Sequence, residues 1–236
     1  MSTHALDDAL HRLGRHSTVD QRLAVLRQLI EYWDGPIGPA SGYSAEELKG
    51  IQMPLPLRWW FKTAGHRQGL MSGQNLLLAP DELRLDDDGR LLFYIENQGV
   101  YLWSTTLIGD DPPVWGRVNE GHIPWSVEGM TLSEFLIGAC LFQTVIGAPF
   151  GASAACADQC TLDRITAEIP PLPIVPWRWP ANPSRFYAKN GAFMFVSPNF
   201  DNHGNEAFSI WVSAKTRQPL SFLKQIVDKE WEHTTL

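Results

Sequence analysis

Acidic, histidine and cysteine side chains at two places in the sequence have the types and spacing that could bind a metal ion. Asp201, His203 and Glu206 can share one loop, and such a cluster would make the chain a metal-dependent hydrolase. Aspartate is also common in turns, so a structural loop is the preferred interpretation. Cys156 and Cys160 have helical i, i+4 spacing, but two ligands are too few for a zinc site, and we expect reduced thiols.

The run Asp86-Asp87-Asp88-Gly89 is a second acidic group, and it resembles a calcium-binding loop only in composition. It lacks the alternating ligand positions and the distal glutamate of such loops, so a solvated hairpin turn is favoured. The sequence also lacks the short motifs of serine hydrolases, zinc proteases, P-loop proteins and dinucleotide-binding proteins. We therefore expect no metal, no cofactor and no enzymatic activity.

Carboxylates gather at turns in the central part of the sequence, where they could face a basic protein as a phosphate backbone would. With a tryptophan as a possible anchor, they form the predicted binding surface, which consists of Asp86, Asp87, Asp88, Asp110 and Asp111 with Trp103 or Trp115. Aspartate is a preferred turn residue, so a set of solvated turns is the alternative interpretation.

Composition sets the class of protein. The 236 residues are 44% hydrophobic, which supports a sizeable core, and their formal net charge is -7. That charge disfavours nucleic acid and anionic membranes as partners and favours a basic protein. The first residues show no basic segment followed by an apolar run, so we expect no secretory signal and a cytoplasmic location. The most apolar stretch, Leu132 to Ile146, is shorter than the ~20 residues of a bilayer-crossing helix.

Apolar residues spaced three and four apart predict four helices before residue 150. They run from Leu6 to Leu13, from Val19 to Trp33, from Pro56 to about Ala64 and from Thr131 to Ile146. Capping boxes mark two starts, at Thr18 with Gln21 and at Thr131 with Glu134. In Trp59-Trp60-Phe61, neighbouring side chains diverge by about 100° around a helix, so at least one ring must leave the core.

Short apolar runs separated by turn residues predict a group of strands. They are Leu76 to Ala79, Arg90 to Glu96, Val100 to Thr106 and Val114 to Val118. Asp88-Gly89 and Asn97-Gln98-Gly99 favour hairpin turns, so consecutive strands should pair antiparallel. We expect Leu91, Phe93 and Ile95 to line one face, and the hairpin Leu91 to Thr106 to pack on the helix Thr131 to Ile146.

The sequence after residue 147 has a different composition and a weaker hydrophobic pattern. Residues 148–183 are a weakly patterned small-residue segment and then a proline-rich strap from Pro170 to Pro183. The strap could bind a partner that reads PxxP, as in a scaffold, but packing on its own domain is the preferred interpretation. Two strands, Arg185 to Ser197 and Glu206 to Ala214, and a closing helix Pro219 to Trp231 are predicted after it.

The stretch YSAEELKGIQMPLPLRWWFKTAG, Tyr43 to Gly65, is followed by NLLLAPDEL and by LLFYIENQGVYLWSTTLIGDDPPVW, Leu91 to Trp115. In the order of its helices and strands and in its short motifs, this region, roughly residues 20 to 147, resembles the SUKH superfamily of immunity proteins and cell-wall-assembly regulators. The resemblance is carried by Leu55-Pro56, Phe93, Glu96, Asn97-Gln98-Gly99, Tyr101, Trp103, Asp111-Pro112 and the helix Thr131 to Ile146. Thr63-Ala64-Gly65-His66 departs from the Asn-Gly pair that the family often has, and the residues after Gly147 exceed its usual compact domain.

This resemblance implies an α+β fold, no catalytic residues, and neutralisation of a toxin by direct contact. The resemblance and the residue patterns together lead us to expect a SUKH-like fold. It has a central, largely antiparallel sheet flanked by helices and a C-terminal β-β-α extension. The expected division is 1–147 for the core with N-terminal helices, 148–183 for the strap and 184–236 for the extension packed on the core. The expected partner is a protein, with a basic toxin as the leading candidate. An intracellular regulator or scaffold is the alternative, a metal-dependent hydrolase is less favoured, and the oligomeric state stays open.

Overall fold

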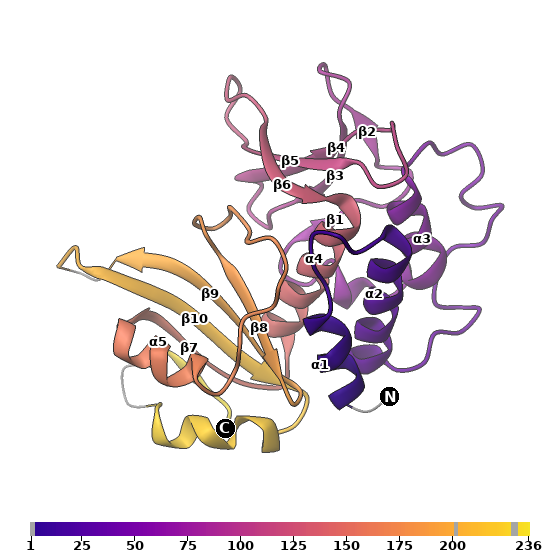
Figure 1. The fold of residues 1–236 in the computed structure, drawn as a ribbon. Coiled ribbons are helices and arrows are strands. Elements are labelled where there is room, and N and C mark those ends of the chain that lie inside the picture. The colour runs from indigo at the N-terminus through magenta and orange to yellow at the C-terminus, as the bar shows by residue number, and fades with distance from the viewer. Residues whose placement is uncertain (1–2, 201–202, 228–230) are drawn as a thin grey trace. The chain divides into compact units, whose positions relative to one another are not determined.

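The structure is a computed structural model in which residues 3–200, 203–227 and 231–236 are described. Its described part has the expected α+β class, with two antiparallel sheets flanked by helices (Figure 1). The chain divides into two compact units. One is Ser17–Gln143, and the other combines Met1–His16 with Thr144–Leu236.

The Ser17–Gln143 unit has three α-helices, which follow the predicted apolar spacing, and a short 3-10 helix, which was not predicted. They are α2 (Val19–Asp34), α3 (Leu55–Ala64), the 3-10 helix η1 (Gln68–Leu70) and α4 (Leu132–Gly147), whose last turn belongs to the second unit. The capping box of α2 is confirmed, because Thr18 and Gln21 each accept the other's backbone N–H with their side chains. Trp60 and Phe61 are buried and Trp59 is half-buried, as the divergence of adjacent side chains requires.

The sheet of this unit has six short antiparallel strands in the described residues. They are β1 (Leu76–Leu77), β2 (Arg84–Leu85), β3 (Leu91–Ile95), β4 (Tyr101–Thr105), β5 (Pro113–Val118) and β6 (Ser126–Thr131). Their order is β1-β3-β4-β5-β6, and β2 also pairs with β3. β2 and β6 are additional to the predicted strands. β6 escapes the apolar pattern because it begins with exposed Ser126 and Val127 and contains Gly129.

The expectation that Leu91, Phe93 and Ile95 line one face is wrong, because β3 contains a β-bulge. Leu92 and Tyr94 each have a partner on β4, and the register shifts between them, so Phe93 is an extra residue. An extra residue reverses the alternation of the side chains that follow it. Ile95 therefore packs beside Leu92 on the face opposite to Phe93.

Helices cover one face of this sheet. Figure 1 shows α2, α3 and α4 on the same side of strands β3 to β6. On that side, the ring centroids of Phe93, Tyr94 and Trp103 lie 5.2, 5.4 and 5.7 Å from the ring of Phe135 in α4. The predicted packing of the hairpin on this helix is therefore confirmed.

The second unit is built on a five-stranded antiparallel sheet in the order β11-β7-β10-β9-β8. Its elements are α1 (Thr3–His11), β7 (Phe150–Ala157), α5 (Gln159–Thr166), β8 (Arg185–Lys189), β9 (Ala192–Phe200), β10 (Glu206–Ala214), the 3-10 helix η2 (Gln218–Gln225) and β11 (His233–Thr234). Leu162 and Ile165 of α5 join the same buried cluster as the small residues Ala152 and Ala154 of β7. These alanines make β7 too weakly apolar to be recognised as a strand.

Two expectations for this part are corrected. Residues 148–183 are not only a strap, since they contain β7 and α5, and the Asp158 carboxylate caps α5 by accepting the N–H of Thr161 at 2.7 Å. The single strand expected from Arg185 to Ser197 is the hairpin β8–β9. Asn190 and Gly191 have φ values of 53° and 81° and form its turn.

The proline-rich strap packs on its own unit, as the preferred interpretation expects. The N–H of Leu172 donates to the carbonyl of Phe186 at 2.8 Å. Trp177 and Ser184 exchange backbone hydrogen bonds of 2.9 and 2.8 Å. Trp177 is buried, and its ring lies 5.6 Å from that of Phe186.

The expected boundaries at 147 and 183 differ from the observed division. Helix α1 belongs with Thr144–Leu236, where the ring of His11 bonds the carbonyl of Ala188 at 2.9 Å and Asp7 accepts the N–H of Asn190. The closing helix predicted from Pro219 is the short η2, and residues 228–230 of that prediction lie outside the described residues. That residues 184–236 pack on the N-terminal core stays a prediction.

Replacing Phe93 or Phe135 by alanine should lower the free energy of unfolding by roughly 3 to 5 kcal/mol, because each ring is fully buried and its loss leaves a cavity. Urea denaturation followed by circular dichroism measures the change. Ile108→Ala is the control, since Ile108 is 84% exposed and should contribute little. A loss below about 1 kcal/mol at both phenylalanines would place the core elsewhere.

Candidate functional site

Trp103, one of the two predicted anchors, cannot serve as one. It is 1% exposed, because it stands on the helix-covered face of β4, opposite Gly116 of β5. Its ring packs 5.3 Å from Tyr94 and 5.7 Å from Phe135. Trp103 is a core residue, and the expectation that it contacts a partner is corrected.

Asp111 is also a structural residue. Its carboxylate accepts the backbone N–H of Ser133 at 2.8 Å and the Ser133 hydroxyl at 2.6 Å, which caps the first turn of α4. It also lies 3.5 Å from the guanidinium of Arg22. Only half of the predicted capping box forms here, as the N–H of Thr131 donates to Glu134 at 3.4 Å.

Asp86 fixes a turn and holds a tryptophan. One carboxylate oxygen accepts the N–H groups of Asp88 and Arg90, at 3.1 and 2.8 Å, and closes the turn between β2 and β3. The other accepts the indole N–H of Trp125 at 2.7 Å. Asp86 thus positions Trp125, which is 39 residues away in sequence, across the sheet.

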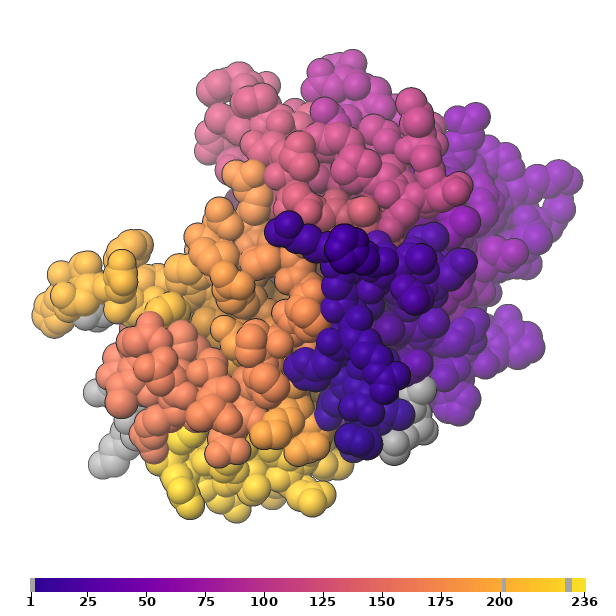
Figure 2. All heavy atoms as spheres, in the orientation of Figure 1, coloured from indigo at the N-terminus to yellow at the C-terminus, as the bar shows by residue number. Residues whose placement is uncertain are grey.

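The remaining three aspartates are exposed and lie at one end of the sheet. Asp87 and Asp88 stand in the turn before β3, and Asp110 stands in the loop after β4. The start of β3 pairs with the end of β4, as Leu91 lies opposite Thr105, so the two connections share this end. We call Asp87, Asp88 and Asp110 the acidic rim. In Figure 2 the connections between these strands, drawn in magenta and pink, project at the surface.

The face of the sheet opposite the helices carries two stacked pairs of arginine and tryptophan. Trp115 and Arg117 alternate with inward residues on β5 and point to this face. The guanidinium of Arg90 lies 4.0 Å from the ring centre of Trp115, and that of Arg117 lies 4.4 Å from Trp125. Both distances are within the range of a cation–π interaction. We call these four residues, together with Val127, the Trp–Arg face.

The apolar patch on that side is covered by side chains of the sheet. No helix among the described residues of this unit lies over it. The patch consists of buried Leu78, Leu92 and Leu102, against which half-buried Trp125 packs. Val127 lies opposite Trp115 in the register and is 53% exposed. Flat aromatic rings are therefore left at a sheet surface that a helix would otherwise hide.

The guanidinium groups of Arg90 and Arg117 have N–H donors that the described residues leave without an acceptor. In the described part of the chain neither forms an ion pair, and the Nε atom of each is buried without a hydrogen-bond partner. Their guanidinium N–H groups can donate to carboxylate or carbonyl oxygens of a partner. The rings beneath hold the planar groups in place, so little freedom is lost when they bind.

Sequence reasoning named Trp115 but missed Arg90, Arg117 and Trp125. The i, i+2 spacing of Trp115 and Arg117 on a predicted strand was a usable signal, because it places both on one face. Trp125 carried no such signal, as it precedes the unpredicted strand β6.

The metal-binding alternatives gain no geometric support. Asp201 lies outside the described residues, and residues 3–200, 203–227 and 231–236 contain no group of three potential ligands arranged around one point. Cys156 and Cys160 are exposed free cysteines. The helices in these same ranges are all too short or too polar to cross a bilayer.

A scan against protein-family models, a search of curated proteins and a search of solved structures each gave no match to this chain. The SUKH resemblance therefore stays a prediction from the motifs.

Replacing Arg22 by methionine should destabilise the protein by about 3 to 5 kcal/mol. Arg22 is almost fully buried and lies 3.5 Å from Asp111 and 3.6 Å from Glu134, so its loss leaves two largely buried carboxylates without this cation. Arg27→Met on the same helix is the matched control, since Arg27 is 47% exposed where it pairs with Glu31 and lies 6.0 Å from the centre of the Trp59 ring, so its loss should cost at most about 1 kcal/mol. If thermal or urea denaturation showed the same loss of stability for Arg22→Met and Arg27→Met, a special role of Arg22 would be contradicted.

Proposed function

We propose that this chain is a non-enzymatic protein-binding protein that contacts its partner through the Trp–Arg face. The observation that carries the proposal is the stacking of Arg90 on Trp115 and of Arg117 on Trp125, on a face that no helix of the unit covers. Tryptophan and arginine are the residues most enriched among those that dominate binding energy at protein interfaces.

The same residues have structural features that favour binding. Asp86 holds Trp125 by a hydrogen bond, and Trp115 is held under Arg90, so both rings are fixed before a partner arrives. Fixed side chains lose little entropy on association. Exposed Val127 supplies an apolar contact beside them, and the terminal guanidinium N–H groups of Arg90 and Arg117, which have no acceptor among the described residues, supply donors around it.

The finer proposal is that the partner is a toxin and that the protein neutralises it by direct contact. It rests on the SUKH-like motifs and on charge. The chain carries a net charge of -7, and the three exposed carboxylates of the acidic rim stand together at one end of the sheet. Such a rim attracts a basic partner over distances of about 10 Å at moderate salt, while the Trp–Arg face supplies the short-range contacts.

A scaffold that presents the proline strap is less well supported. The strap forms backbone hydrogen bonds to β8 or its flanking residues at Leu172 and Trp177. A PxxP-reading domain would have to displace these bonds before it could bind.

The direct test uses the product of the neighbouring gene, because immunity proteins are commonly encoded beside their toxins. Co-expression of this chain should restore the growth of cells that produce the toxin, and the two purified proteins should form a stoichiometric complex. If the neighbouring product neither harms cells nor binds, the toxin-neutralising proposal is wrong.

Reversing the charges of Arg90 and Arg117 to glutamate should weaken that complex by about 100-fold or more, because two central contacts are removed. Isothermal titration calorimetry measures the affinity, and circular dichroism verifies the fold. The control carries Lys49→Glu and Lys62→Glu, which reverse two exposed charges just before and within α3, on the other side of the sheet (Figure 1). Equal affinity of wild type and the Arg90/Arg117 variant would place the contact surface elsewhere.

Replacing Asp87, Asp88 and Asp110 by lysine should slow association with a basic partner and abolish the decrease of the association rate with salt, while dissociation changes little. Stopped-flow or surface-plasmon measurements at two ionic strengths give both rates. Asp86 and Asp111 are left intact because they hold Trp125 and cap α4. Unchanged association with unchanged salt dependence would show that the rim is only a set of solvated turns.

A further inference from the structure

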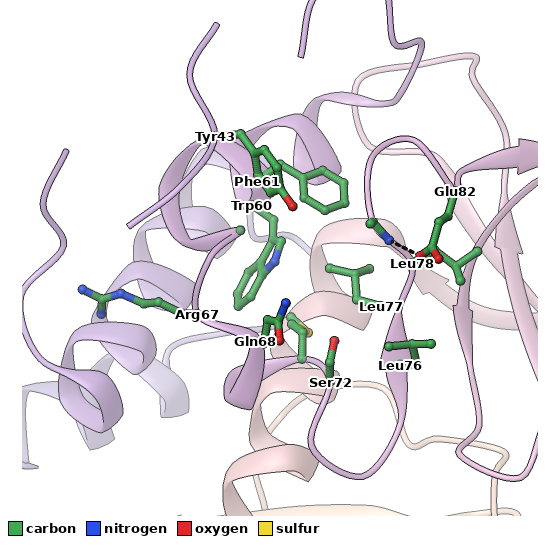
Figure 3. A pocket seen from close by; sticks show the side chains of 13 residues that line it. Tyr43, Trp60, Phe61, Arg67, Gln68, Ser72, Leu76, Leu77, Leu78 and Glu82 are labelled. Carbon is green, nitrogen blue, oxygen red and sulfur yellow. Dashed lines mark hydrogen bonds between the residues drawn. The ribbon is translucent and has the colours of Figure 1, made fainter. Parts of the chain in front are cut away.

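A pocket in the Ser17–Gln143 unit lies between α3, η1 and the segment that includes β1. Its volume is about 240 Å³, and Figure 3 shows the side chains that line it. Trp60 and Phe61 of α3 and Tyr43 form an aromatic wall, and Leu77 of β1 stands across from them. None of these residues belongs to the Trp–Arg face.

The aromatic wall is built before any ligand binds. The N–H of Tyr43 donates to the carbonyl of Phe61 at 2.8 Å, and the two rings meet edge to face with centroids 5.9 Å apart. Gly65 makes this approach possible, because a Cβ there would lie 2.5 Å from the Tyr43 ring. Gly42 is required in the same way, since its Cβ would lie 2.4 Å from the carbonyl oxygen of Phe61. A wall fixed in this manner keeps its shape without an occupant.

Three polar side chains face the pocket without a hydrogen-bond partner in the described part of the chain. They are the indole N–H of Trp60, the amide of Gln68 and the hydroxyl of Ser72. Trp60 is 1% exposed as a whole, and Figure 3 shows its indole N–H directed toward the space in front of Leu77. A ligand that covered this N–H without offering an acceptor would remove its water, which is unfavourable, whereas a ligand oxygen at this place would accept a hydrogen bond from it.

The charges around the pocket decide what kind of ligand fits. Arg67 lines the pocket, but its guanidinium turns away and is held by Asp34 at 3.2 Å and by the carbonyl of Gly35 at 2.7 Å. The exposed carboxylate of Glu82 stands at the side, held by the N–H of Ala79 at 2.9 Å. An anion would meet this carboxylate and find no free cation, so a neutral ligand is favoured.

We propose that this pocket binds a neutral aromatic ring that bears a hydroxyl group, the chemistry of a phenol. The hydroxyl oxygen accepts the indole N–H of Trp60, and its proton goes to the amide oxygen of Gln68 or to Ser72. The ring lies between the aromatic wall and Leu77. The cavity is smaller than the ~300 Å³ at which pockets for drug-sized ligands begin, so it suits one ring. The ring comes either from a free phenol or from a tyrosine side chain of a polypeptide.

The test follows the indole N–H signal of Trp60 in nitrogen-15-labelled full-length protein. Para-cresol should shift this signal saturably at concentrations up to about 10 mM. Toluene, which has the same ring without the hydroxyl, should bind roughly 10-fold more weakly because the N–H stays unpaired. Benzoate should not bind. No saturable shift with para-cresol, or equal binding of toluene, would overturn the proposal.

A second compound identifies the source of the ring. N-acetyltyrosinamide carries the same phenol with a peptide backbone. If it binds at least as tightly as para-cresol, the pocket takes a tyrosine side chain; if only para-cresol binds, it takes a free phenol. Both results support the phenol site.

Variants locate the bound compound. Gln68→Leu should weaken para-cresol binding by roughly 10-fold by removing one hydrogen bond, whereas Gln52→Leu, an equivalent change at an exposed position outside the pocket, should have no effect. Ser72→Leu should fill the cavity and abolish binding, with an otherwise unchanged amide spectrum as evidence of folding. Wild-type binding by both pocket variants would place the compound elsewhere. These results are independent of the Arg90 and Arg117 variants, so either proposal can fail alone.

Discussion

A buried arginine between two carboxylates is the interaction on which the Ser17–Gln143 unit depends. Arg22 of α2 reaches Asp111 of the loop after β4 and Glu134 in the first turn of α4. Three elements that are distant in sequence therefore meet at one charge. Breaking such a pair leaves uncompensated charge in a medium that solvates it poorly, so the helix layer is held to one face of the sheet. Asp111 serves twice, because it also caps α4 through Ser133.

This arrangement determines which face can contact other molecules. Because α2 and α4 are held to one side through Arg22, the opposite side must cover its apolar patch with what its own strands provide. It does so with tryptophans and arginines, whose long apolar surfaces exclude water while their polar groups remain available. A helix in the same place would exclude water equally well but would hide the sheet. The covering layer of this face is therefore also a surface that a partner can bind.

Much of this fold was predictable because local chemistry determines it. Thr18 and Gln21 cap α2 wherever the helix lies, and Gly89 and Gly99 take positive φ in their turns whatever surrounds them. The bulge at Phe93 and the strand β6 were not predictable in the same way, because each depends on pairing with another strand. The turn at Asn190 was an overlooked local signal, since Asn-Gly is among the strongest hairpin sequences.

The candidate site shows why charge alone is a poor guide to function in a sequence. Five aspartates were grouped because they lie in neighbouring turns, yet two of them have structural roles: Asp111 caps a helix, and Asp86 accepts the indole N–H of Trp125. A carboxylate close to unpaired backbone N–H groups is used locally first, because those groups must be satisfied. Only carboxylates without such a neighbour stay free for a partner. Arg90 and Arg117 are the opposite case, because their terminal guanidinium N–H groups have no acceptor among the described residues. Hydrogen-bonding capacity that the fold leaves unused, more than charge itself, indicates where a second molecule would add stability.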